Sequence, residues 1–299
     1  MANCSKSKFW HVPVMVEEVL NFLKCKPEGC YIDGTIGGGG HADVILKASA
    51  PSGRLFGIDK DSDAISQAQE RLAEFGDRVT IVQGAFSKIH ELIKISCADG
   101  ILLDLGVSSY QLDSSSRGFG FREEGILDMR MDSSAIVSAA DIIKEFDEQK
   151  LANIIFEYGE ERYSRQIARA IVKKRQISPI LTTHDLAAVV LSSMPAYARK
   201  GKIHPATRTF QALRIFINDE LGELHRFLDA APKILCSGAR LLIISYHSLE
   251  DRIVKRAFKA WELRGGYKVI TKKVIRPSAD ECYKNPRSRS AKLRVLERQ

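Results

Sequence analysis

The stretch at residues 33–61 constrains the fold more than any other part of the sequence. It starts with DGTIGGGGH at residues 33–41, continues through an alanine-containing helical run, and ends with RLFGIDKD at residues 54–61. This order predicts a strand, a glycine loop, a helix and a second strand that ends in the carboxylate of Asp59. Glycines let a backbone adopt positive φ and approach a ligand closely, while a carboxylate about 20 residues later can hydrogen-bond ribose hydroxyls. The stretch therefore predicts a Rossmann-like α/β sheet that binds a nucleoside-containing cofactor.

The glycine loop also indicates which nucleoside cofactor binds. A dinucleotide site needs glycines that leave room for a pyrophosphate at a helix N-terminus, and this loop fits that pattern poorly. Counted from Asp33, the loop follows the pattern D-x-T-x-G-x-G-G-H. This pattern is closer to the acidic-then-glycine motif of enzymes that use S-adenosylmethionine (SAM), with Thr35 where the general motif has glycine. We therefore expect SAM rather than NAD as the cofactor.

The composition is that of an ordinary globular chain with an excess of positive charge. Its 299 residues are 44% hydrophobic and 27% charged, which is enough to bury a full core and to form two domains. The formal net charge of +8 favours a polyanionic partner such as nucleic acid. The N-terminal segment lacks the apolar core of a signal peptide, and no apolar run is long enough to span a membrane. We therefore expect a cytoplasmic protein.

The cysteines and acidic pairs do not predict a metal site. Six cysteines are scattered along the chain without a C-x-x-C pair or a nearby histidine cluster, which predicts reduced, mostly buried thiols. Asp128 and Asp132 could bind a metal, but a solvated acidic pair is the preferred interpretation. We therefore expect no metal cofactor.

Further strands are predicted to complete the sheet at residues 78–83, 100–104 and 239–246. Ligands in an open parallel sheet lie beyond the carboxyl ends of the strands, so the residues there are site candidates. Phe86 follows the first of these strands, where it either stacks near an adenine or belongs to the core. Asp104 ends the second strand, and a buried aspartate must make a hydrogen bond. After the third strand, Ser248 and Asp251 predict a helix cap, a contribution to the cleft, or both.

The alternation of strands and helices stops after residue 106. Two segments, residues 117–121 and 127–132, predict an ordered loop with exposed aromatic and charged groups. Helical periodicity returns at residues 147–158, 161–174, 182–194 and 204–228. We therefore divide the chain into the first part of a SAM-binding methyltransferase domain (1–106), an inserted helical substrate-recognition domain (107–206) and the second part of the methyltransferase domain with a basic C-terminal tail (207–299).

The C-terminal part of the chain carries a local excess of lysine and arginine. Residues 267–275 and 293–297 have strand character and predict the closing antiparallel hairpin of the sheet. Between them, Arg287 and Arg289 belong to a basic loop that is suited to contact phosphates.

Several ordered segments together resemble the RsmH (MraW) family, whose members are SAM-dependent methyltransferases of 16S ribosomal RNA. These segments are residues 33–41, 104–109, 117–121, 127–132, 204–213, 247–252 and 290–294. The resemblance covers nearly the whole chain and implies methylation of the exocyclic N4 of a cytidine in the decoding region of the small ribosomal subunit. It leaves open whether the protein forms a homodimer. The alternatives are a methyltransferase of another RNA or DNA base and a SAM-binding ribosome assembly factor without catalysis.

The chemistry of the implied reaction predicts individual substrate-site residues, and the resemblance implies the cofactor contacts. Asp104 is expected to accept hydrogen bonds from the N4 protons, or else to act as a base, and Tyr110 or Phe119 is expected to stack the target base. Tyr246 stands where the family often has phenylalanine, a departure that is not expected to change the chemistry. The cofactor contacts of the family fall on Gly39, Gly40, His41, Asp59, Phe86, Asp104 and Gln111, and further substrate contacts are expected from Arg208, His247, Arg287 and Arg289.

Overall fold

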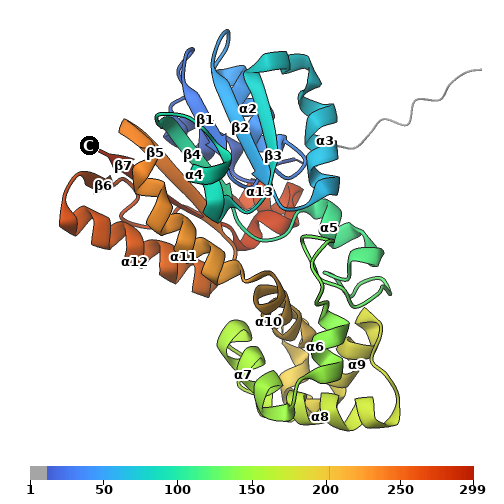
Figure 1. Ribbon diagram of the computed structural model, residues 1–299. Helices are drawn as coiled ribbons and strands as arrows, with labels where there is room; N and C mark the ends of the chain where they lie inside the picture. Colours follow the sequence, from blue (N-terminus) through green and yellow to red (C-terminus); the bar gives the residue numbers. More distant parts are fainter. Residues whose placement is uncertain (1–11, 202) are drawn as a thin grey trace, which may run out of the picture. The chain divides into compact units, whose positions relative to one another are not determined.

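The computed structural model describes residues 12–201 and 203–299, which form two compact units (Figure 1). The sheet unit comprises the chain up to residue 106 together with residues 223–299, and the helical unit comprises residues 107–222. The sequence predicts a return to the sheet unit at residue 207, which is too early. Helix α10 (Ala206–Asn218) packs on helix α7 (Glu148–Gly159) and therefore belongs to the helical unit.

A seven-stranded mixed sheet forms the frame of the sheet unit, with the order β3-β2-β1-β4-β5-β7-β6. Neighbouring strands run parallel from β3 to β5, and β7 is antiparallel to both β5 and β6. The predicted Rossmann-like fold and its closing hairpin are confirmed, although β6 is shorter than predicted. The strands are β1 (Cys30–Asp33), β2 (Arg54–Asp59), β3 (Val79–Gln83), β4 (Ala98–Asp104), β5 (Leu235–Ser245), β6 (Tyr267–Val269) and β7 (Lys292–Arg298).

Each face of the sheet builds its own hydrophobic core. Alternation along β4 places Ile101 and Leu103 in one core and Leu102 in the other. Helices cover both faces, as a largely parallel sheet requires (Figure 1). The first core contains side chains from α4 (Ile89–Leu92), α11 (Glu220–Ala230) and α12 (Ser248–Arg264), and the second contains side chains from α1 (Val16–Leu23), α2 (Gly40–Ala48) and α3 (Ser62–Leu72).

The strand register brings three carboxylates to one edge of the sheet. Asp33 at the end of β1 lies opposite Gly57 of β2 and Leu102 of β4. Asp59 and Asp104 end those two strands just beyond these partners. Because the three strands are parallel neighbours, the loops that follow them start at the same edge.

Shorter elements connect these parts of the sheet unit. Asp61 caps α3, because its Oδ1 accepts a 3.0 Å hydrogen bond from the N–H of Asp63. The connecting elements are the 3₁₀ helices η1 (Ala73–Arg78), η2 (Phe86–Lys88), η5 (Ala231–Lys233) and η6 (Pro286–Ser290) and the helix α13 (Ala279–Lys284).

The helical unit packs around a core of its own, to which α7, α8 (Ser164–Ile177), α9 (Thr183–Ser193) and α10 contribute. Thr182 and Asp185 form the capping box of α9. The single long helix predicted from residue 204 is wrong, because Asp219 adopts φ +49° and ends α10 before α11 begins. The remaining elements are α5 (Ser109–Asp113), η3 (Ser115–Arg117), the unpredicted α6 (Ala139–Glu145) and η4 (Ala196–Lys200).

The loop at residues 117–132 packs three apolar side chains into this helical core, while residues 122–124 and 126 are exposed. Phe119, Leu127 and Met129 are buried, and the guanidinium of Arg117 donates to the carbonyls of residues 130 and 131. Asp128 is not a solvated carboxylate: Arg130 donates to its two oxygens at 2.8 and 2.7 Å, and this pairing lowers the pKa of Asp128 despite partial burial.

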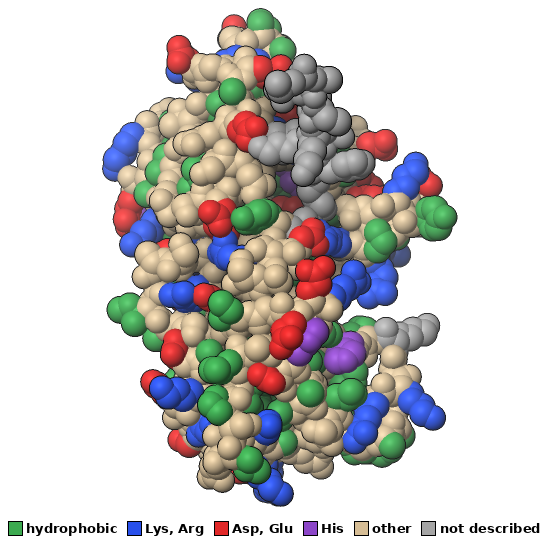
Figure 2. Space-filling model, turned by 90° about the vertical axis from the view of Figure 1, so that its right-hand side faces the viewer, with side chains coloured by type: hydrophobic (Ala, Val, Ile, Leu, Met, Phe, Trp, Pro, Cys, Tyr) green, Lys and Arg blue, Asp and Glu red, His purple; other side chains and the backbone are tan. Residues whose placement is uncertain are grey.

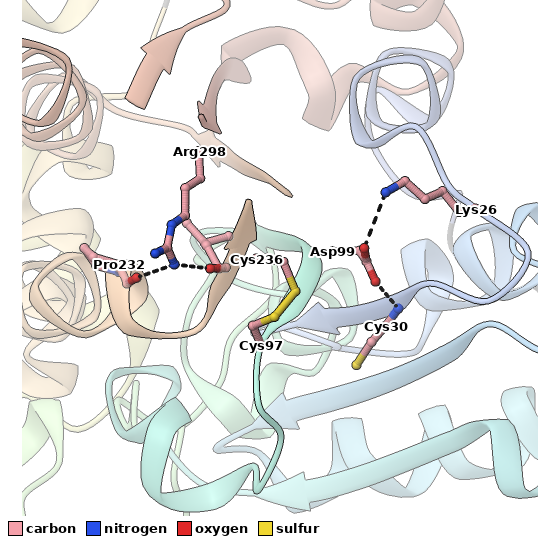
Figure 3. Close-up of a disulfide and its surroundings, with 8 residues drawn as sticks. Lys26, Cys30, Cys97, Asp99, Pro232, Cys236 and Arg298 are labelled. Atoms are coloured by element: carbon pink, nitrogen blue, oxygen red, sulfur yellow. Dashed lines mark hydrogen bonds and ion pairs between the residues drawn. A yellow bond between two sulfur atoms is a disulfide. The ribbon is translucent and has the colours of Figure 1, made fainter. Parts of the chain in front are cut away.

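The prediction that all cysteines are reduced is wrong for one pair. Cys97 precedes β4 and Cys236 lies in β5, and their sulfur atoms form a disulfide across these neighbouring strands (Figure 3). Beside it, Asp99 accepts from the backbone N–H of Cys30 at 2.9 Å and pairs with Lys26 at 3.5 Å. The sequence could not reveal the pair, because the two cysteines are 139 residues apart and meet only through strand pairing.

No helix in the described part of the chain is long and apolar enough to cross a membrane. On the face shown in Figure 2, lysine and arginine side chains are interspersed with acidic ones.

Candidate active site

The glycine loop after β1 is the first component of the site. Gly37 adopts φ +51° and Gly39 adopts φ +78°. Residues with a side chain rarely adopt this left-handed backbone conformation. The N–H of Gly37 donates a 2.9 Å hydrogen bond to Oδ2 of Asp59, and the N–H of Ile36 donates to the carbonyl of Ile58. Gly39 is the N-cap of α2, and Gly40 is its first residue. The loop is thus tied to the end of β2, and Gly37 and Gly38 are its half-buried glycines.

Asp59 therefore has a structural contact in addition to its predicted contact with ribose. Its Oδ1 accepts from the N–H of Asp61 at 3.0 Å, while Oδ2 accepts from Gly37. Burial raises the pKa of Asp59, and these backbone hydrogen bonds oppose the rise. Each carboxylate oxygen can accept more than one hydrogen bond, so Asp59 retains capacity for ribose hydroxyls.

Asp104 and His41 approach each other beside the loop. The Nδ1 of His41 lies 3.7 Å from Oδ2 of Asp104, and its Nε2 lies 2.8 Å from the carbonyl oxygen of Val14. The backbone N–H of Asp104 donates to the hydroxyl of Thr35 at 2.7 Å. This contact explains why a threonine suits a position where the general motif has glycine: it links the loop to the end of β4.

Asp33 belongs to the site, although in the sequence it only marks the start of the glycine motif. Its side chain is 1% exposed, and Oδ2 has no hydrogen-bond partner among the described residues. Burial raises its pKa to about 7, with His41 lowering it and Asp104 and Asp59 raising it. A buried carboxylate oxygen without a partner is costly and suits a ligand that brings a donor or a positive charge. Its position at the end of β1 was the signal that could have identified it.

Tyr246 also reaches this group of carboxylates, a contact that the sequence did not predict. Its hydroxyl donates a 2.8 Å hydrogen bond to Oδ1 of Asp104. The predicted cap after β5 is shifted by one residue: His247 and Glu250 form the capping box of α12, rather than Ser248 and Asp251. Because His247 is buried and Nδ1 accepts from the N–H of Glu250, its observed role is structural.

Phe86 is predicted either to stack near an adenine or to belong to the core, and its position is compatible with both. It is the first residue of η2, and its half-buried ring makes an edge contact with Phe227 at a centroid distance of 5.7 Å. The ring belongs to the border of the first sheet core. It therefore lies at the ligand edge without being fully enclosed, and contact with an adenine remains a prediction.

The predicted residues in the helical unit have different environments. Gln111 is buried and forms a capping box with Ser108, while Tyr110 is 43% exposed. Phe119 is 7% exposed and packs in the helical core, so it does not offer a free ring face to a base and that expectation is wrong. Arg208 is exposed and pairs with the buried Glu161 at 3.6 Å.

The basic C-terminal segment is less uniformly available than its sequence predicts. Arg289 is exposed and Arg287 is half-buried, both in η6. Lys284 pairs with Asp280 at 2.7 Å. Arg294 is buried and pairs with Asp251 at 2.6 Å, so it contributes to the fold rather than to an anion-binding surface.

These features fit SAM better than a dinucleotide. Three carboxylates, Asp33, Asp59 and Asp104, lie at the ends of neighbouring strands beside the glycine loop. Carboxylates attract the ammonium and sulfonium of SAM and accept from its ribose, whereas they repel a pyrophosphate. Gly37, Gly39 and Asp59 would hold the nucleoside part, and the unpartnered oxygen of Asp33 suits a cationic group.

The MraW methylase family matches residues 8–299 of this sequence. The chain belongs to this family. Among its relatives, the ribosomal RNA small subunit methyltransferase H of Nostoc sp. is 52% identical over 97% of this chain and 93% of its own length. The proteins of the same name from Trichormus variabilis and Syntrophobacter fumaroxidans are 50% and 45% identical, over 98% and 97% of this chain and 93% and 96% of their own lengths. This MraW methylase is therefore a SAM-dependent methyltransferase, as the sequence predicts.

Proposed function

We propose that this MraW methylase transfers the methyl group of SAM to the exocyclic N4 of a cytidine in the decoding region of 16S ribosomal RNA. Its relatives are called ribosomal RNA small subunit methyltransferase H, which supports small-subunit RNA as the substrate. The carboxylate of Asp104 beside the glycine loop is the observation that carries the choice of an amine acceptor. A ribosomal RNA substrate also favours the cytoplasm, as expected from the sequence.

The chemistry of cytosine N4 explains the need for an acceptor at this place. The N4 lone pair is conjugated into the ring, so the nitrogen is a weak nucleophile until its protons are held and its lone pair is directed. Asp104 is 23% exposed at the end of β4 and can accept a hydrogen bond from N4–H. Holding two reactants in line can lower a barrier by about 7 to 11 kcal/mol, so orientation is the main contribution that we assign to these residues.

The transfer balances without a covalent enzyme intermediate. When bound, SAM supplies an electrophilic methyl group, which the N4 lone pair takes while the electrons of the C–S bond remain on sulfur. The methylated N4 is then a cation and loses one proton to water. Asp104 holds N4–H during transfer as an acceptor, and no base is required before the new bond has formed.

Two further groups are proposed to hold the RNA. Tyr110 is the exposed aromatic side chain that is suited to stack the base, since Phe119 is buried. Arg287 and Arg289 are proposed to contact phosphates, and Arg208 is proposed as a further contact. His247 is not retained as a substrate contact because it is buried in the cap of α12.

The role of Asp104 is tested by comparing two substitutions. Asp104→Asn keeps an acceptor oxygen, and the hydroxyl of Tyr246 can accept from the new amide N–H. Asp104→Asn should therefore transfer methyl much faster than Asp104→Ala in single-turnover reactions at saturating SAM. Asp99→Asn is the matched control, because Asp99 lies at the opposite end of the same strand.

Asn and Ala variants that are equally slow, with SAM still bound, would make Asp104 a general base instead. A general base typically contributes about a hundred- to ten-thousandfold. Methylation of a different base, or SAM binding without turnover by the unaltered protein, would favour the two alternatives to the proposed function.

A further inference from the structure

Tyr246 is the first residue after β5, and its backbone position is set by the start of α12. Its N–H donates to Oε2 of Glu250 at 2.8 Å, and the N–H of His247 donates to the same oxygen at 3.2 Å. Glu250 is 2% exposed. The ring of Tyr246 faces Gly106, where an added Cβ would lie 3.5 Å from the ring. The helix cap and this glycine therefore direct the Tyr246 side chain toward β4.

The hydroxyl of Tyr246 contacts the carboxylate of Asp104. Since β4 and β5 are parallel neighbours with Asp104 opposite Ile244, Tyr246 lies just beyond the partner of Asp104 and donates to Oδ1 at 2.8 Å. Burial raises the pKa of Tyr246 well above its usual value, so the hydroxyl keeps the proton that it donates. Within residues 12–201 and 203–299, no other side chain hydrogen-bonds the carboxylate of Asp104.

His41 does not replace this donor. Its Nδ1 is 3.7 Å from Oδ2 of Asp104, which exceeds hydrogen-bond distance. Its Nε2 lies 2.8 Å from the carbonyl of Val14, and because a carbonyl only accepts, Nε2 carries the proton. Oδ2 remains available to a ligand, whereas Oδ1 is occupied.

The other charged groups around this pair are acidic. Asp33 faces Asp104 from β1, Glu250 faces both residues from α12, and Glu281 of α13 acts on Tyr246. Burial raises the pKa of Asp104 and Glu250 raises it further, whereas His41 and the hydrogen bond from Tyr246 lower it. Tyr246 therefore stabilises the ionised carboxylate without adding a charge to the site.

We propose that Tyr246 is a positioning residue for methyl transfer: its hydroxyl occupies Oδ1 of Asp104, stabilises the carboxylate, and leaves Oδ2 as the oxygen that faces the amine. When Asp104 takes up a proton, the proton goes to Oδ2, because Oδ1 is already engaged, and Oδ2 then no longer accepts from N4–H. The effect on catalysis rests on the proposed function of Asp104, whereas the coupling between Tyr246 and Asp104 does not.

The test compares Tyr246→Phe with Tyr267→Phe. Each change removes one phenolic oxygen from the sheet unit, but Tyr267 lies on the edge strand β6 and packs on Trp261. The ionisation of Asp104 is followed by the ¹³C carboxyl resonance of labelled aspartate, assigned with Asp104→Asn. Loss of a hydrogen bond to a charged group shifts the ionisation midpoint of that group by about one to two pH units. The Asp104 midpoint should rise by that amount in Tyr246→Phe and stay unchanged in Tyr267→Phe.

The second readout is the pH dependence of single-turnover methyl transfer at saturating SAM. Its acid limb should move to higher pH in Tyr246→Phe by the same amount as the Asp104 midpoint. A folded Tyr246→Phe variant with an unchanged Asp104 midpoint overturns the coupling, and a moved midpoint with an unmoved acid limb overturns the positioning role. An inactive unaltered protein would overturn the proposed function, while the carboxyl resonance would still decide whether Tyr246 controls Asp104.

Discussion

The N–H of Gly37 donates a 2.9 Å hydrogen bond to Oδ2 of Asp59, so the carboxylate that ends β2 holds the glycine loop that follows β1. One side chain thus serves both the loop and the predicted ribose contact. The two halves of the cofactor motif are coupled through this bond before any ligand is present.

Asp59→Ala should therefore weaken SAM binding. Loss of a charge-assisted hydrogen bond typically costs roughly 1.5 to 3 kcal/mol, or about ten- to a hundredfold in affinity. Titration calorimetry with SAM measures the change, and Asp77→Ala, which removes an exposed carboxylate from the same unit, is the control. Unchanged affinity in a folded Asp59→Ala variant would remove Asp59 from the cofactor site.

Asp33 should make stability depend on pH in the absence of SAM. Its pKa is raised to about 7 in the fold, so the folded state binds its proton more tightly than the unfolded chain does. The free energy of unfolding should then decrease as pH rises from about 4 to about 7 and level off above that. Asp33→Asn should remove this part of the slope and unfold at a higher temperature than the unaltered protein at pH 8.

Thermal unfolding at pH 5 and pH 8 checks this prediction. Asp33→Asn should bind SAM more weakly than the unaltered protein, although it is the more stable of the two at pH 8, because Asn cannot offer a negative charge to a cationic group. A pH slope of equal size in both proteins would show that Asp33 does not titrate in this range.

The disulfide between Cys97 and Cys236 should stabilise the sheet unit without controlling the chemistry. A cross-link of this kind typically contributes about 2 to 4 kcal/mol by restricting the unfolded chain. The double variant Cys97→Ser and Cys236→Ser should melt at a lower temperature and keep its methyl-transfer rate, since β4 and β5 remain hydrogen-bonded. The change Cys25→Ser is the control, because Cys25 has a free thiol. Equal melting temperatures under oxidising conditions would contradict a stabilising cross-link.

The basic segment at η6 should make RNA binding sensitive to salt. Each neutralised phosphate contributes a slope of roughly 0.7 to 0.9 in log affinity against log salt. The double variant Arg287→Ala and Arg289→Ala should flatten that slope. The control is the double variant Lys255→Ala and Lys259→Ala, which removes the same charge from the exposed surface of α12 and should leave the slope unchanged. An unaltered slope in the η6 variant would mean that these arginines do not contact phosphates.

The sequence was most informative where function depends on local spacing. The glycine loop, Asp59 and Asp104 could be predicted because each lies at a strand end that hydrophobic patterning marks. Tyr246 could not be linked to Asp104, because the two residues are 142 positions apart and meet through the pairing of β4 with β5. Phe119 was misplaced for a related reason: nothing local shows that its loop packs into the helical core. Tertiary contacts determine where such side chains lie, and the periodicity of the sequence does not encode these contacts.

The position of the transferred methyl group tests the proposed function most directly. Small-subunit ribosomal RNA, incubated with this MraW methylase and isotopically labelled SAM, is digested to nucleosides and analysed by mass spectrometry against N4-methylcytidine and 5-methylcytidine standards. The proposed function predicts label in N4-methylcytidine, much less of it with Asp104→Ala, and no change with Asp99→Asn. Label on carbon 5, on another base, or on no nucleoside at all would contradict it.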